Sequence, residues 1–129
     1  MTEKWRPGIN HIEFWVSNKE RSLPFYEGLF EVIGWKKLNE WAFSTGSMEI
    51  YFKVVAQVKL DTIGPRHICF QAENRNVVDT VFEYLKRHDT KIIRGPIERN
   101  EYSTGYYTVD FYDPDGYVLE VAYTPNMIL

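Results

Sequence analysis

Two histidines and two glutamates have the chemistry and the spacing to build one site. His11 and His67 each lie in the first predicted strand of one half of the chain, and Glu49 and Glu120 each lie in its last. Two imidazoles and two carboxylates form a charge-balanced ligand set for a divalent cation such as Zn²⁺, Ni²⁺, Co²⁺, Mn²⁺ or Fe²⁺. We therefore expect one such ion as the cofactor, with no nucleotide or organic cofactor.

Glu120 gives the strongest single indication of a site. It lies between Leu119 and Val121 in the most apolar strand of the chain, where an unpartnered carboxylate is costly to bury. Metal coordination would stabilise it there. Each of the other candidates has an ordinary explanation by itself, as a hydrogen-bonded or solvated side chain. Their matching places in the two halves favour the metal site.

The two halves of the chain repeat one pattern. A shift of 56 residues carries His11 to His67, and it also superposes apolar residues through the first strand and the helix of each half: Ile12 on Ile68, Phe14 on Phe70, Phe25 on Val81, Tyr26 on Phe82 and Leu29 on Leu85. We interpret residues 1–129 as one domain of two β-α-β-β-β modules, at about 8–54 and about 65–124. An α+β fold follows, with a curved, barrel-like mixed sheet and the helices outside. Equivalent side chains would then converge about a pseudo-twofold axis.

Periodicity and turn residues place the elements. The first module is predicted as a strand, a helix and three strands: Ile9–Val16, Ser17–Gly34, Trp35–Leu38, Trp41–Thr45 and Met48–Val54. After a connector at Val55–Gly64, the second is predicted as a strand, a helix, a strand, a polar loop and a hairpin: Arg66–Ala72, Asn74–His88, Lys91–Arg94, Gly95–Gly105 and Tyr106–Tyr123. Pro114 and Gly116 predict a type I turn within the hairpin.

Composition excludes several classes of partner. The net charge of −3 provides no basic surface for nucleic acid. The single cysteine excludes an internal disulfide and agrees with a reducing cytoplasm. No apolar run approaches the roughly 20 residues that cross a bilayer, and the N-terminus has no apolar leader. We expect a cytoplasmic protein without a membrane partner.

The motifs HIEFWV, PFYEGLF, RHICFQ and DPDGYVLE resemble the vicinal oxygen chelate superfamily, from Gly8 to about Tyr123. That superfamily includes glyoxalase I, extradiol dioxygenases and bleomycin-binding proteins. The resemblance to glyoxalase I implies four metal ligands: His11, Glu49, His67 and Glu120. It also implies a homodimer and a metal-dependent lyase or isomerase reaction on a small molecule such as a thiol adduct. Glu120 is the first candidate for the proton-transferring base and Glu49 the second.

Two other functions stay open. An extradiol dioxygenase would hold Fe(II) with His11, His67 and Glu120 alone, and a bleomycin resistance-like protein would bind its ligand without a metal. Glu49 favours the glyoxalase-like branch. Glyoxalase I typically has an Arg that binds glutathione where this chain has Trp15, so the identity of the thiol co-substrate stays open. We expect a substrate pocket walled by five residues: Trp15, Tyr51, Lys53, Tyr107 and Phe111.

Overall fold

The predicted order of elements is confirmed in the computed structural model, which describes residues 7–59 and 64–127. The first six residues of the expected leader-free N-terminus and the middle of the predicted connector lie outside these ranges. The first module consists of β1 (His11–Val16), α1 (Lys19–Ile33), β2 (Lys36–Asn39), β3 (Ala42–Ser44) and β4 (Glu49–Val54). The second consists of β5 (Ile68–Gln71), α2 (Arg75–Arg87), β6 (Ile92–Glu98), β7 (Tyr107–Tyr112) and β8 (Val118–Tyr123).

Asparagine caps begin both helices. The side chains of Asn18 and Asn74 each accept a hydrogen bond from a backbone N–H in the first turn, at 3.0 Å in both cases. The cap at Asn18 makes α1 begin at Lys19, within the predicted range Ser17–Gly34, and Pro24 lies inside the helix. Gly34 ends α1 in the left-handed conformation, at φ 96°. Within the described ranges, no helix combines the length and apolarity that a bilayer crossing requires.

The strands form two curved four-stranded mixed sheets. Their orders are β1-β4-β3-β2 and β5-β8-β7-β6. In each sheet the first strand of the module pairs in parallel with the last, and the remaining pairs are antiparallel. The α+β class and the curved mixed sheets are as predicted, and the sheets do not close into a barrel.

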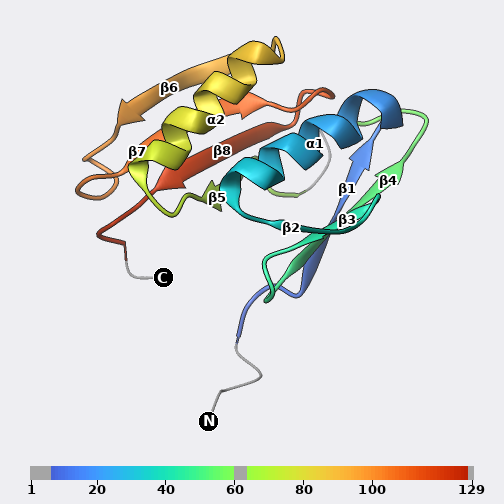
Figure 1. Ribbon diagram of the computed structural model, residues 1–129, viewed down its shortest axis with the longest axis horizontal. Coiled ribbons are helices and arrows are strands. Elements are labelled where there is room, and N and C mark those ends of the chain that lie inside the picture. The colour runs from blue at the N-terminus through green and yellow to red at the C-terminus, as the bar shows by residue number, and fades with distance from the viewer. Residues whose placement is uncertain (1–6, 60–63, 128–129) are drawn as a thin grey trace.

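One hydrophobic core spans both modules. The helices lie side by side (Figure 1), and the hydroxyl of Tyr84 in α2 donates a 2.8 Å hydrogen bond to the carbonyl oxygen of Phe25 in α1. Phe30 of α1 packs edge-on against Phe70 of β5, with the ring centroids 5.5 Å apart. Each module therefore covers apolar surface of the other.

β6 differs from the prediction, because it continues through Gly95 and Pro96 to Glu98. The register with β7 shifts twice along this strand, so the glycine and proline mark bulges on an edge strand. A Cβ atom at Gly95 would collide with the backbone oxygen of Thr108 in β7. The residues that suggested a loop therefore permit a close approach between two strands.

Candidate active site

The predicted ligands face away from the helices. In β1, Phe14 and Val16 pack into the core, so the alternating residues His11, Glu13 and Trp15 project from the opposite surface. In β8, Leu119 and Val121 pack into the core and Glu120 projects oppositely. We call this opposite surface of each sheet the helix-free face.

The first half-site, His11 and Glu49, lies on the first sheet. The two residues are direct partners in the parallel β1–β4 register. The hydroxyl of Tyr51 donates a hydrogen bond to Glu49, and its ring lies edge-on to the His11 ring at 5.5 Å. That hydrogen bond raises the pKa of Tyr51, so the phenol stays protonated and remains a donor near neutral pH.

The second half-site, His67 and Glu120, lies on the second sheet. His67 Nε2 is 3.2 Å from Glu120 Oε1. Glu120 is only 4% exposed, and its other oxygen, Oε2, accepts hydrogen bonds from the hydroxyls of Tyr106 at 2.7 Å and Thr108 at 2.6 Å. Burial, followed by the hydrogen bond to Glu120, raises the pKa of Tyr106 and keeps it a donor. The buried carboxylate therefore has protein partners besides any metal.

Tyr106 and Thr108 were missed in the sequence. The available signal was alternation: Thr108 lies on one face of β7, which pairs with β8, and Tyr106 stands two positions before it, immediately ahead of that strand. Asp110 continues this face and is the direct register partner of Glu120. Its Oδ2 accepts a 2.6 Å hydrogen bond from Arg94 Nε, and its buried Oδ1 has no partner among the described residues. Burial, followed by the charge of Glu120, raises the pKa of Asp110.

The two half-sites differ in register. Glu49 is the partner of His11, whereas the partner of Glu120 is Cys69, two residues beyond His67. A shift of two residues keeps Glu120 on the same face of the strand, because side chains alternate with a period of two. The duplication therefore preserves the face of each ligand but not its position along the strand.

The donor atoms of the two half-sites together suit a divalent transition metal ion, and each half-site supplies half of the ligands. Each half-site offers an imidazole and a carboxylate, and at the second the nitrogen and oxygen that would share an ion already face each other. Among residues 7–59 and 64–127 of one chain, no three His, Cys, Asp or Glu side chains gather closely enough to hold a metal. The four predicted ligands are thus brought together in pairs.

Three of the expected pocket residues, Trp15, Tyr51 and Lys53, alternate with the buried core residues of β1 and β4 and lie on the helix-free face. The structure does not bring the other two there. The Tyr107 hydroxyl donates to Asp79 of α2 at 2.5 Å, and Arg75 of α2 stacks on its ring. Phe111 is fully buried in the core. Both alternate with Thr108 and Asp110, which fixes them on the helix side of β7.

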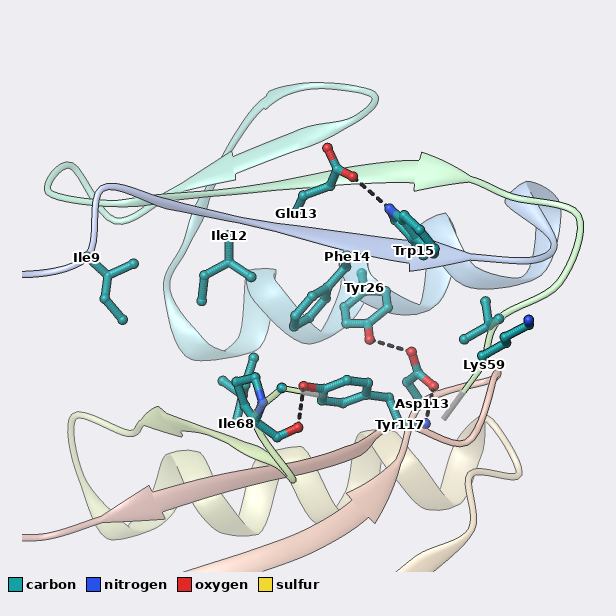
Figure 2. Close-up of a pocket in the computed structure, with 13 residues that line it drawn as sticks. Ile9, Ile12, Glu13, Phe14, Trp15, Tyr26, Lys59, Ile68, Asp113 and Tyr117 are labelled. Carbon is teal, nitrogen blue, oxygen red and sulfur yellow. Dashed lines mark hydrogen bonds between the residues drawn. The ribbon is translucent and has the colours of Figure 1, made fainter. Parts of the chain in front are cut away.

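An apolar cavity of about 550 Å³ separates the edge strands β1 and β5. Figure 2 shows Ile12 and Phe14 of β1 facing Ile68 and Tyr117 across it. A neighbouring cavity of about 570 Å³ shares Ile12 and Ile68 as lining residues. The gap between the two sheets is therefore lined mainly by aliphatic and aromatic side chains.

Comparison with known proteins agrees with the fold of two mixed sheets and two helices. The family model described as Glyoxalase/Bleomycin resistance protein/Dioxygenase superfamily matches residues 8–121. The uncharacterised protein YqjT of Bacillus subtilis is 25% identical over 127 residues, covering 88% of this chain and 97% of that protein.

Two solved structures illustrate the likeness in fold. A glyoxalase/bleomycin resistance protein from Albidiferax ferrireducens has a TM-score of 0.73 at 18% identity, covering 90% of this chain and 98% of its own. The fosfomycin resistance protein FosX from Mesorhizobium loti has a TM-score of 0.66 at 20% identity, with 92% and 93% covered.

Proposed function

The chain belongs to the Glyoxalase/Bleomycin resistance protein/Dioxygenase superfamily, and from that premise we propose that it is a divalent-metal-dependent enzyme of the glyoxalase type. Members of this superfamily commonly bind a divalent metal ion and act on or bind small molecules. The substrate we propose is a small molecule, such as a thiol adduct, with two neighbouring oxygen atoms. The observation that carries the proposal is the second half-site, where His67 and Glu120 face each other at 3.2 Å.

His11, Glu49, His67 and Glu120 would hold the ion. When bound, the ion would act as a Lewis acid toward the substrate oxygens and acidify the adjacent C–H group. The chain itself must then supply a base. Glu120 is fixed by Tyr106 and Thr108, whereas the one described hydrogen bond to the Glu49 side chain comes from the exposed Tyr51. We therefore propose proton transfer by Glu49, the second candidate from the sequence, and a purely ligating role for Glu120, which was the first.

Both half-sites must meet for this chemistry. Within the described part of one chain they remain two pairs, and β1 and β5 are edge strands that border an apolar gap. We infer a homodimer in which the first half-site of one chain joins the second half-site of its partner. A closed twofold dimer of this kind contains two equivalent complete sites.

Metal content after anaerobic purification tests the proposal. We expect the wild-type protein to retain one transition metal ion per chain, because a dimer has two sites. His67→Gln and Glu120→Gln should each lose it, and His88→Gln should retain it, because His88 caps α2 and its ring packs against Tyr84 at 4.2 Å instead. Hemithioacetals of several thiols would then be assayed for isomerisation, with oxygen uptake measured in parallel. Oxygen consumption on a catechol would favour the dioxygenase chemistry.

The apolar cavities favour one second candidate, a small-molecule-binding protein without turnover. Their combined aliphatic and aromatic lining suits a hydrophobic ligand, and this function needs no ion. It predicts metal-free protein and chemically unchanged ligand after incubation. That result would contradict the enzymatic proposal.

A further inference from the structure

We propose that Tyr106 and Thr108 are positioning residues that restrict Glu120 to one metal-facing oxygen, so that an ion keeps room for both oxygens of a chelating ligand. The inference rests on the proposed function, because it assumes that the half-sites hold an ion. It assigns a role to two residues that are not themselves predicted ligands.

The hydrogen bonds of Glu120 are divided unequally between its two oxygens. Oε2 accepts from Tyr106 at 2.7 Å and from Thr108 at 2.6 Å, whereas Oε1 faces His67 Nε2 at 3.2 Å. A carboxylate oxygen has two lone pairs in its plane, so two hydroxyl donors fill Oε2. The Thr108 hydroxyl also lies 3.1 Å from the backbone oxygen of Val121, but its shorter contact is to the charged carboxylate. Only Oε1 is left for an ion.

The two donors are fixed by the fold. Thr108 is fully buried in β7, directly opposite Ala122 in the register with β8. The Tyr106 ring packs edge-on against Tyr102 at 5.2 Å. On the other side of the carboxylate, 52% of the His67 side chain is exposed, against 6% for Glu120. The hydroxyls thus hold the inner oxygen and direct the outer one toward the accessible side.

This restriction matters for a ligand that binds through two oxygens. Four ligands that each use one atom leave two places on a six-coordinate ion. If Glu120 bound through both oxygens, it would occupy one of those places. Tyr106 and Thr108 therefore favour binding of a two-oxygen ligand without contacting that ligand.

The test uses Co²⁺-loaded protein and two probes, acetohydroxamate, which binds through two oxygens, and azide, which binds through one atom. Both are titrated by the visible absorption of Co²⁺, which responds to coordination number. In Tyr106→Phe and in Thr108→Val we expect acetohydroxamate to bind on the order of 10–100-fold more weakly, a loss as large as the one in metal affinity or activity that follows removal of outer hydrogen-bond partners of metal ligands. Azide binding should change far less.

Two variants serve as controls. Tyr102→Phe removes a neighbouring hydroxyl that contacts Arg94 and should behave as wild type. Thr108→Ser keeps the donor and should restore acetohydroxamate binding. Equal weakening of both probes, or none, would overturn this inference while leaving the proposed function intact. Failure of the wild-type protein to bind Co²⁺ would overturn both.

Discussion

Asp113 is a buried carboxylate that joins the β7–β8 turn to α1. Its Oδ1 accepts the backbone N–H groups of Asp115 at 2.9 Å and Tyr117 at 2.8 Å, and its Oδ2 accepts the Tyr26 hydroxyl at 2.6 Å. Burial raises the pKa of Asp113, although these donors act in the opposite direction. The sequence predicted the turn correctly but contained no local signal for the contact with Tyr26.

Asp113→Asn should change how stability depends on pH. Because the folded-state pKa of Asp113 is raised, its contribution is fully present below the unfolded pKa and is lost as pH rises through the folded pKa. The unfolding free energy of wild type minus that of Asp113→Asn should therefore be largest in acid and should shrink as pH rises above about 4. Urea unfolding at a series of pH values measures this difference.

The exposed carboxylate Glu31, also in the first module, offers a control for this substitution. Glu31 lies on the outer surface of α1, so Glu31→Gln should change the unfolding free energy little at every pH. If the Asp113→Asn difference instead grew with pH, the sign assigned to Asp113 would be contradicted.

Individual site residues were predictable only in part. Glu120 was identified because a charge in an apolar strand is conspicuous. The inference that this buried carboxylate needs partners was correct, since two hydroxyls donate hydrogen bonds to it. Tyr106 and Thr108 were not identified, because tyrosine and threonine are common in strands for packing reasons alone. Their role depends on which strand lies beside β8, which is a property of the pairing.

At the scale of elements, sequence patterns predicted best those elements that depend on neighbouring residues, such as helices and turns. Apolar stripes and turn residues indicated both helices and most strands. β6 was predicted too short because Gly95 and Pro96 favour a break, whereas pairing with β7 carries the strand onward. The register of β5 against β8 was equally hidden, since no short-range pattern specifies how two strands separated by a helix align.

The contact between the helices depends on Gly28 in α1. A Cβ atom there would lie 2.6 Å from one ring carbon of Tyr84 and 2.7 Å from another. Gly28→Ala should lower the unfolding free energy by up to about 2 kcal/mol, because overpacking costs about 1–3 kcal/mol while helix propensity returns about 1 kcal/mol. Chemical denaturation measures the change.

Glu31→Ala is the matched control for that substitution. It places alanine at an exposed position of the same helix, where propensity alone acts, so stability should stay level or rise slightly. A Gly28→Ala protein more stable than wild type by about 1 kcal/mol, the full gain in helix propensity, would mean that Tyr84 can move without cost.

For the whole molecule, the sequence indicated a duplication but not how its halves meet. Repeated modules imply a shared centre, yet the same repeat can pair within one chain or between two. In the structure His11 lies with Glu49 and His67 lies with Glu120, as two pairs. The proposed homodimer would unite them.

Mixing two inactive variants tests that pairing. His11→Ala damages every first half-site and His67→Ala every second, so each variant alone should bind no ion. If sites form between chains, half of a randomly mixed dimer population carries one intact site, and metal binding should return to about a quarter of wild type. Equilibrium dialysis after co-refolding measures this recovery.

The control is a mixture of His67→Ala with Glu120→Ala, which share one half-site and should not complement each other. If the first mixture also recovered nothing while the wild-type protein bound its ion, pairing between chains would be contradicted.

The shared core has a consequence for the history of the chain. Phe30 and Tyr26 of the first module reach Phe70 and Asp113 of the second, so neither repeat has a complete interior of its own. A gene fragment encoding one repeat would yield a product with a bare aromatic surface. A half-length ancestor would have needed self-association to cover this surface, and fusion of two copies would have made that intermolecular contact permanent.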